Sequence, residues 1–460
     1  MRFYGFFSLN VTTAQQKEVK SIVSLCKDYV NLVDMMALKA VRYQPSILSL
    51  EELILFTINH RCITPKIMKY RRFGRTELEI PIFSCGGMRY QYKWQDFPLK
   101  DIPDDNQQNL EKTIYRSLEV GINHIETARS YGTSEVQLGK ILPKLPRDKL
   151  IIQTKVIPEG GVKEFSNKFK QGLSLLNLDY VDLLGIHGIN TLEILESCIR
   201  SGGYLEEARK LQKQGKIRFI GFSTHGSTDV IMKTINTDNF DYVNLHWYYI
   251  NQNNWPAIKA ARERDMGVFI ISPSDKGGKL YDPPQKLVEL CQPLSPIVFN
   301  DLFCLSCPQI HTLSLGASCP KDFDEHLKTL SYLGNPNEIL TPVIQKLEQE
   351  CIKVLGESWY RTWHIGLPSQ DHTPGNINIP VILWLRNLAL AYDMIDYGVM
   401  RYNLLGNGGH WFPGKNAERV KEFDLKPCLV NSPHQNEIPE LLVETHQLLG
   451  GKLVQRLSQV

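Results

Sequence analysis

Eight short apolar runs, separated by amphipathic stretches, occupy the chain from residue 70 to about residue 330. The runs are Ile80–Cys85, His124–Thr127, Leu150–Val156, Val181–His187, Ile217–Phe222, Tyr242–Trp247, Val268–Ile271 and Thr312–Leu315. Strands that alternate with helices predict a parallel sheet whose strands are joined by helical crossovers. Eight such units in about 260 residues match the size of a closed (β/α)8 barrel. The sequence therefore predicts an α/β protein of the TIM-barrel class.

The stretches between the runs have the spacing of amphipathic helices. Three of them place apolar residues on one helical face, namely Leu110, Ile114, Tyr115 and Leu118, then Phe165, Phe169, Leu173 and Leu176, then Tyr204, Leu205, Ala208 and Leu211. An open, doubly wound sheet is the rival fold. Its glycine-rich G-x-G-x-x-G turn should follow the first strand, but the first run continues as Ser84-Cys85-Gly86-Gly87-Met88. This favours the barrel.

The segments on either side of the predicted barrel, residues 68–335, differ from it. Residues 1–67 show no alternation of strands and helices. They are either a small helical extension, since apolar residues recur at helical spacing from Ile22 to Val33, or not native, with Met68 as the true initiator. We favour the second interpretation. Residues 336–460 predict a mainly helical C-terminal domain, with helices beginning at Pro380 and Pro439.

Composition excludes several classes of protein. Hydrophobic residues make up 42% and charged residues 22% of the 460, which is typical of a globular chain. The formal net charge of +3 predicts neither nucleic acid nor a membrane as a partner, and it leaves the oligomeric state open. Ten scattered cysteines, and an N-terminus unlike a signal peptide, predict reduced thiols in the cytoplasm. Cys304 and Cys307 form a lone CxxC pair that is expected to serve packing.

Four ionisable residues fall at or just after the predicted strand ends, where barrel enzymes carry their chemistry. They are Glu126, Tyr131, Lys155 and His187. A lysine within an apolar strand is costly unless it is paired, and Glu126 and Tyr131 are the nearest candidates. Each residue alone has a structural explanation, such as a buried ion pair. Because four of them converge on one face, we interpret them as a catalytic site.

The motifs around these residues resemble the aldo/keto reductase family. The similar segments are Ile125–Gly139 with its Tyr131-Gly132-Thr133-Ser134-Glu135, Gln153–Lys155, Leu178–His187 and Gly215–Ser223. The resemblance covers residues 70 to about 330 and implies an NADPH-dependent carbonyl reductase on a (β/α)8 barrel. It implies that Tyr131 is the general acid, that Lys155 lowers its pKa, that Glu126 orients Lys155, and that His187 binds the substrate oxygen.

The resemblance also implies a set of cofactor-binding residues. Trp247 takes the place of the aromatic ring that stacks on nicotinamide, and Asn244 and Ser223 take positions that bind its carboxamide. The loop Ser272–Leu280 is similar to the one that covers the pyrophosphate, and Gly316–Lys321 resembles a phosphate loop. The residues implied in these loops and after the first strand are Gly87, Met88, Ser272, Lys276, Gly277, Gly316, Ser318 and Lys321. Ser318 and Lys321 could hold a 2′-phosphate, so NADPH is expected rather than NADH.

Glu126 departs from the family, which has aspartate at this position. The charge is kept, but the extra methylene displaces the carboxylate, and a small misplacement in a catalytic site can cost about a hundredfold in rate. The sequence therefore leaves two hypotheses. One is a working reductase, and the other is an NADP(H)-binding regulatory or interaction protein with little turnover.

The C-terminal domain resembles the ferredoxin-like segment of one branch of these reductases, without its cluster ligands. Thr373 and Ser432 stand where the family has cysteine, and Cys428 alone lies near a ligand position. Because iron–sulfur clusters need about four thiolates each, we expect no cluster and no other metal site. The domain is expected to be held by packing around its tryptophans, Trp359, Trp363, Trp384 and Trp411.

Overall fold

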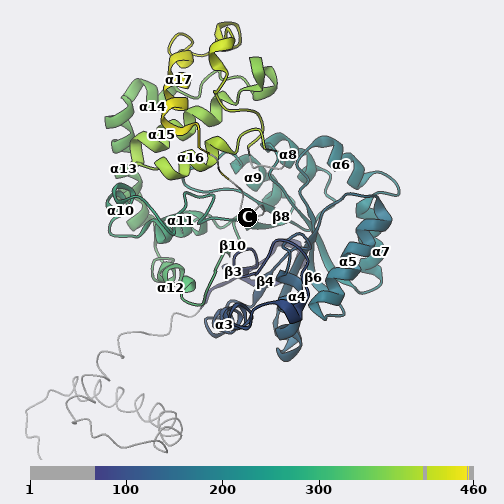
Figure 1. Cartoon of the computed structure of the whole chain (residues 1–460). Coiled ribbons are helices and arrows are strands. Elements are labelled where there is room, and N and C mark those ends of the chain that lie inside the picture. The colour runs from purple at the N-terminus through teal and green to yellow at the C-terminus, as the bar shows by residue number, and fades with distance from the viewer. Residues whose placement is uncertain (1–67, 408–411, 453, 455–460) are drawn as a thin grey trace, which may run out of the picture. The chain divides into compact units, whose positions relative to one another are not determined.

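Eight parallel strands close into a barrel in the computed structural model, which describes residues 68–407, 412–452 and 454 (Figure 1). The strands are β3 (Phe83–Gly86), β4 (His124–Glu126), β5 (Ile151–Val156), β6 (Val181–His187), β7 (Ile217–Ser223), β8 (Tyr242–Leu245), β9 (Gly267–Ile270) and β10 (Thr312–Leu315). They follow one another around the barrel in chain order, and β10 pairs with β3 to close it. The predicted barrel is confirmed. Its strands are almost entirely buried, as parallel strands covered on both faces must be.

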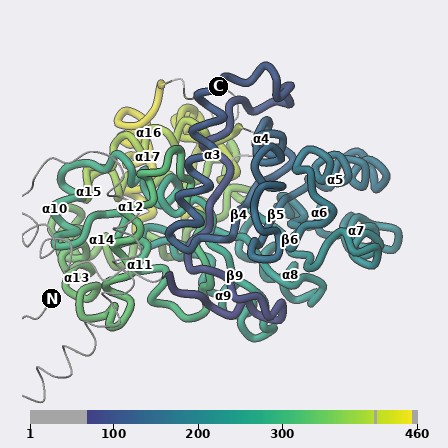
Figure 2. Tube along the Cα trace, turned by 90° about the horizontal axis from the view of Figure 1, so that it is seen from below, coloured from purple at the N-terminus to yellow at the C-terminus, as the bar shows by residue number. Residues whose placement is uncertain are grey.

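Helices cover the outside of the barrel, and several of them can be seen beside the strands in Figure 2. They are α3 (Asp104–Glu119), α4 (Ser134–Ile141), α5 (Val162–Leu176), α6 (Leu192–Ile199), α7 (Tyr204–Lys213), α8 (Thr228–Asn236), α9 (Trp255–Glu263), α10 (Gln285–Cys291), α11 (Pro296–Leu305) and α12 (Asp322–Leu327). The three predicted apolar faces pack against the barrel core, with one exception. Tyr115 is 50% exposed, because its position on α3 lies at the margin of the buried face.

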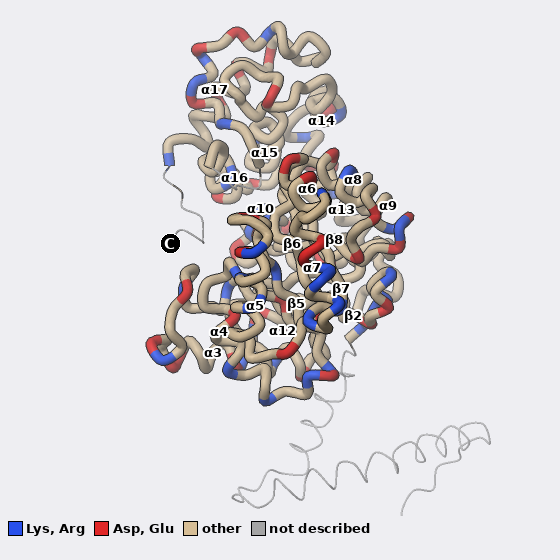
Figure 3. Tube along the Cα trace, turned by 90° about the vertical axis from the view of Figure 1, so that its right-hand side faces the viewer, with Lys and Arg blue, Asp and Glu red and all other residues tan. Residues whose placement is uncertain are grey.

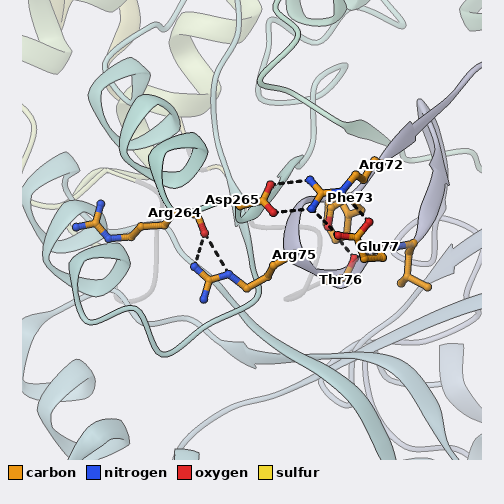
Figure 4. A network of polar contacts seen from close by, with 8 residues as sticks. Arg72, Phe73, Arg75, Thr76, Glu77, Arg264 and Asp265 are labelled. Atoms are coloured by element: carbon orange, nitrogen blue, oxygen red, sulfur yellow. Dashed lines mark hydrogen bonds and ion pairs between the residues drawn. The ribbon is translucent and has the colours of Figure 1, made fainter.

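A β-hairpin packs on the amino-terminal ends of the strands. It consists of β1 (Tyr70–Arg72) and β2 (Glu79–Pro81), so the predicted run Ile80–Cys85 belongs to two strands rather than one. Phe73, in the hairpin, is buried against barrel residues such as Tyr242 at the start of β8. Figure 4 shows Arg72 bridging Glu77 and Asp265, the latter just before β9. The hairpin therefore stabilises the end of the barrel opposite to the strand ends that carry the candidate site.

The C-terminal helices build a second hydrophobic core beside the barrel. They are α13 (Pro336–Leu355), α14 (Glu357–Thr362), α15 (Ile379–Tyr392), α16 (Ile395–Asn403) and α17 (Ile438–Leu449). Helix α13 packs on α10 and α11, and the barrel and the C-terminal helices form one compact unit. The helix predicted at Pro380 is present, and the side chain of Asn378 caps its first turn. Short 3-10 turns connect the remaining segments.

Two of the predicted tryptophans show how this region is held. The indole of Trp359 is buried and donates a hydrogen bond to Asn387 at 2.9 Å. The indole of Trp384 donates to the carbonyl oxygen of Ile250 at 2.7 Å, which ties α15 to the loop after β8. Trp411 and residues 1–67, with the helical pattern predicted there, lie outside the described residues.

The surface carries both signs of charge. Figure 3 shows acidic and basic residues interspersed over the side that it presents. Within the described residues, no helix combines the length and the apolar character that a membrane crossing requires.

Candidate active site

The carboxyl ends of three neighbouring strands bring the four predicted site residues together. Glu126 ends β4, Lys155 is the last residue but one of β5, His187 ends β6, and Tyr131 lies in the loop after β4. All four line one cavity of about 360 Å³. Because the strands are parallel and in register, side chains at their ends meet on one face of the barrel.

Lys155 is the buried cation of this cavity. Its ammonium group donates to the carboxylate of Glu126 and, at 2.8 Å, to the carbonyl oxygen of Thr127. Gly185 lies beside it in the register of β5 and β6, and a methyl group there would come within 3.0 Å of the lysine stem. Burial disfavours the charge on Lys155, but Glu126 and Tyr131 together outweigh this effect and raise the pKa of the lysine. Lys155 therefore stays charged at neutral pH.

Glu126 reaches Lys155 despite its extra methylene. Its second carboxylate oxygen accepts a hydrogen bond from the hydroxyl of Ser314 at 3.2 Å. Gly86, on the neighbouring strand, leaves the space: a β-carbon added there would lie 3.3 Å from the carboxylate and only 2.6 Å from Ser314. Both oxygens of the carboxylate are thus held in a buried, hydrogen-bonded position.

Tyr131 lies next to this ion pair. The ammonium nitrogen of Lys155 is 4.7 Å from the centre of the tyrosine ring, and His187 and Trp94 meet the same ring edge-on at 6.1 Å and 6.0 Å. We expected Lys155 to lower the pKa of Tyr131. The net shift is in the other direction: burial raises the pKa of the phenol, and the nearby Lys155 charge offsets only part of this rise. The physical reason is that the cavity removes water from the phenolate as well as bringing a cation to it.

His187 presents a neutral imidazole to the cavity. Its Nδ1 is 3.2 Å from the hydroxyl of Ser130. Burial lowers the pKa of His187 to about 3, and the positive charges of Lys155 and Lys276 act in the same direction. At neutral pH the ring can donate one hydrogen bond through one nitrogen and accept through the other.

The residues expected to bind the cofactor divide into two groups. Those that line the same cavity are Met88, Ser223, Ser272, Lys276 and Gly316. Those that do not line it are Gly87, Asn244, Trp247, Gly277, Ser318 and Lys321. Gly87 and Gly277 have a packing reason. A β-carbon on Gly87 would lie 2.8 Å from the backbone oxygen of Glu126 at the end of β4, and one on Gly277 would lie 1.9 Å from that of Pro273 in the same loop.

Asn244 differs from the other residues outside the cavity lining. It is fully buried on β8 beside Ser223, and among the described residues neither the oxygen nor the nitrogen of its amide has a hydrogen-bond partner. Buried amides are rarely left without partners in proteins. Its donor and acceptor match those of a carboxamide, so this residue fits a nicotinamide group.

Trp247 does not fit the stacking role implied by the resemblance. Its ring is buried and stacks on Phe303 at 4.8 Å, with Trp255 at 5.4 Å. The indole is large and apolar, and the aromatic side chains of α9 and α11 give it a buried site away from the cavity. His246, one residue earlier, turns toward the cavity side and stacks on His225, a residue of the cavity lining.

Ser318 already forms hydrogen bonds with a neighbouring residue of the protein. Its amide and hydroxyl donate to the carboxylate of Asp322 at 2.8 Å and 2.7 Å. Burial opposes ionisation of Asp322, but the hydrogen bonds from Ser318 and Cys319 outweigh it and hold the pKa of that carboxyl below its usual value. Lys321, Asp322 and Glu325 line a second cavity of about 410 Å³. The expected phosphate loop therefore presents two carboxylates beside its one lysine.

Several residues of the cavity lining were not predicted from the sequence. Arg89, Trp94 and His225 come from barrel loops. Met400 and Arg401 come from α16 of the C-terminal region, and Leu404 directly follows that helix. Arg89 could have been predicted, since it directly follows Met88, which was expected to bind the cofactor. No sequence signal could have placed the residues of α16 at the cavity, because a sequence does not indicate which face of a distant helix contacts a barrel loop.

At the positions where cluster ligands are expected to have been lost, the side chains form ordinary hydrogen bonds within the protein. Thr373 is buried and donates to the carbonyl oxygen of Ser369 at 3.0 Å, and the thiol of Cys428 donates to the carbonyl oxygen of Leu425 at 3.1 Å. Ser432 accepts a hydrogen bond from the amide of His434. Within the described ranges, no group of three or more histidine, cysteine or acidic side chains has an arrangement that could hold a metal ion.

Comparison with known proteins finds a family whose members are similar to the barrel region. Residues 84–277 match the model of the Aldo/keto reductase family. A probable aldo-keto reductase from Glycine max is 27% identical over 42% of this chain, and an aldo-keto reductase from Mycolicibacterium smegmatis is 31% identical over 38%. The chain is similar to the aldo/keto reductase family over residues 84–277, which include all four strand-end site residues. It spans only 56% and 60% of the lengths of these two aldo/keto reductases.

Solved structures of aldo/keto reductases share the fold. The holo form of an aldo-keto reductase from Bacillus halodurans has a TM-score of 0.51 and 20% identity, covering 61% of this chain and 96% of its own. A thermostable aldo-keto reductase in complex with the inhibitor epalrestat has a TM-score of 0.51 and 21% identity, covering 61% and 100%. The shared part corresponds in extent to the barrel.

Proposed function

We propose that the chain is a nicotinamide-dependent carbonyl reductase with Tyr131 as its general acid. The observation that carries the proposal is the buried Glu126–Lys155 pair beside Tyr131, with His187 edge-on to the same ring, in a cavity at the carboxyl ends of the strands. The similarity of residues 84–277 to the aldo/keto reductase family supports the same reaction class.

Residues of the cavity lining, together with Asn244, which is paired in strand register with the lining residue Ser223 but does not itself line the cavity, fit a nicotinamide cofactor. The buried amide of Asn244, which has no partner among the described residues, would hold the carboxamide together with Ser223. Lys276 and the loop that begins at Ser272 would lie against the phosphates. The bound nicotinamide would supply a hydride to the carbonyl carbon of the substrate.

The side chains of the protein would manage the proton and the substrate oxygen. Tyr131 donates its phenolic proton to that oxygen as the carbon is reduced, which yields the alcohol. His187, neutral at physiological pH, donates a hydrogen bond to the same oxygen and orients the carbonyl. Lys155 remains charged and stabilises the phenolate that Tyr131 leaves behind, and Glu126 holds Lys155 in place. Bulk water then returns a proton to Tyr131.

The choice between NADPH and NADH depends on the loop after β10. Lys321 favours NADPH, which is the expected cofactor, whereas the carboxylates of Asp322 and Glu325 repel a 2′-phosphate. We therefore propose NADPH with weak discrimination against NADH. We also propose a small aldehyde or ketone as the substrate, a cytoplasmic location, and a C-terminal region derived from a ferredoxin-like segment without its cluster.

The proposal is tested by titrating the full chain with each dinucleotide and then following its oxidation with a panel of aldehydes and ketones. We expect binding of the dinucleotide and turnover of at least one carbonyl compound. Tight binding without turnover of any compound would favour the second candidate, a cofactor-binding regulatory protein. The absence of binding would refute both.

A further inference from the structure

The carboxyl end of α16 forms part of the cavity wall. Met400, Arg401 and Leu404 line the cavity with the barrel residues, although they follow the last barrel strand by more than 80 positions. Met400 and Arg401 are adjacent residues near the carboxyl end of α16, and Leu404 directly follows this helix. The C-terminal region is therefore part of the site itself.

Arg401 links this helix to the loop after β9. Its guanidinium donates to the carboxylate of Asp275 at 2.8 Å, and the arginine is buried. Burial disfavours the charge, but Asp275, Tyr397 and Tyr248 together outweigh it and raise the pKa of Arg401. The ring of Tyr397 lies 5.4 Å from the same guanidinium and supports its position.

Two further contacts hold the same loop. The hydroxyl of Tyr397 donates to the carbonyl oxygen of Lys276 at 2.7 Å. Gly278 has a φ of 134°, and a β-carbon there would come within 2.9 Å of the methyl group of Met394. The loop thus packs closely against α16 and the residue before it, while Asn300 of α11 donates to Pro273 from the barrel side.

We propose that Arg401 is a positioning residue that holds the loop Ser272–Leu280 in the conformation that binds the dinucleotide. This rests on the function proposed above. A loop held in its binding conformation loses little conformational entropy when the ligand arrives, so its contribution to affinity is larger. Removing Arg401 leaves the carboxylate of Asp275 without its strongest partner at the cavity edge, and the loop opens more often.

The experiment compares two variants that break the same ion pair from opposite sides, Arg401→Met and Asp275→Asn. Arg401→Lys keeps the charge, and Arg361→Met is the matched control, because it removes an exposed ion pair within α14 that lies outside the cavity. Two quantities are measured for each full-length protein. They are the hydrogen-exchange rates of the amides in residues 272–280 without cofactor, and the dissociation constant of each dinucleotide from tryptophan fluorescence.

We expect Arg401→Met and Asp275→Asn each to speed exchange in the loop, and to weaken dinucleotide binding, by about tenfold to a hundredfold. Amides of β6 should keep their protection in both, Arg401→Lys should restore part of the loss, and Arg361→Met should change neither quantity. The rate of hydride transfer at saturating cofactor should change by less than the affinity.

Unchanged loop exchange and unchanged affinity in Asp275→Asn would overturn the proposal, even if Arg401→Met fails to fold. Equal loss of protection in β6 and in the loop would also overturn it, because the effect would then be a general loss of stability. If the unaltered protein binds no dinucleotide, the proposed function fails, and the exchange rates alone decide whether Arg401 holds the loop.

Discussion

Glu126 and Lys155 form a buried ion pair that joins the end of β4 to the end of β5. The carboxylate also accepts a hydrogen bond from Ser314 on β10, so that three strands of the barrel meet at one charged group. A glutamate in place of the aspartate of the family is therefore accommodated without loss of the pair. This geometry favours a working site over a decayed one.

Replacing Glu126 tests that interpretation. Glu126→Gln leaves Lys155 as an uncompensated buried cation and should lower the free energy of unfolding by about 3–5 kcal/mol. The reduction rate should fall as well. Denaturant titration and steady-state kinetics measure the two effects.

Glu126→Asp distinguishes a working site from a decayed one by the direction in which the activity changes. In a site adapted to glutamate, the shorter side chain loses its reach to Lys155 or Ser314, and activity should fall modestly. In a decayed site, the aspartate restores the geometry of the family, and activity should rise. Equal rates in the unaltered protein and both variants would mean that Glu126 takes no part in the reaction.

The pH dependence of the rate follows from the shifted pKa values. Tyr131 must be protonated to act as an acid, and its pKa lies above 10, so activity should be lost only as the pH rises into that range. The imidazole of His187 becomes charged only near pH 3. The maximal rate should therefore be flat between about pH 5 and pH 9. A descending limb near neutral pH would mean that the charge of Lys155 outweighs burial and brings the pKa of Tyr131 below its usual value.

The architecture could be predicted from the sequence because parallel strands buried on both faces leave a strong apolar signal. The four strand-end residues could be predicted for a related reason: in a parallel barrel, the last residues of neighbouring strands must lie together. Both inferences depend only on local pattern and on the rules of one fold.

Other features could not be predicted because they depend on contacts between distant segments. Whether Trp247 faces the cavity or the core is decided by Phe303, a residue of α11. The ion pair of Asp275 with Arg401 joins residues 126 positions apart. The direction of the pKa shift of Tyr131 depends on how much water the finished cavity excludes, which no spacing of residues indicates.

Asp322 should weaken the preference for NADPH. Its carboxylate takes the two donors of Ser318 and is charged at neutral pH, so it repels a second anion. Asp322→Asn should lower the dissociation constant of NADPH by about threefold to tenfold and leave that of NADH nearly unchanged. Fluorescence titration with the two dinucleotides measures both constants. An equal change in both would mean that Asp322 acts on the fold of the loop and not on the phosphate.

The C-terminal region should hold no iron. Thr373 and Ser432 cannot supply thiolates, and clusters need about four of them. Protein purified without oxygen should be colourless, and elemental analysis should find no stoichiometric iron. A brown protein with the visible absorbance of an iron–sulfur cluster would contradict the assignment of this region.

The most direct test of the account is the single-turnover rate of hydride transfer in Tyr131→Phe. The phenylalanine keeps the ring between His187 and Trp94 and removes only the hydroxyl, so dinucleotide binding should stay within about twofold of the unaltered protein. Because a positioned general acid contributes about 10²–10⁴-fold, the rate of dinucleotide oxidation by a carbonyl substrate should fall by that factor. A Tyr131→Phe protein that binds the dinucleotide and reduces the substrate at the unaltered rate would contradict the role of Tyr131 and, with it, the mechanism proposed for this site.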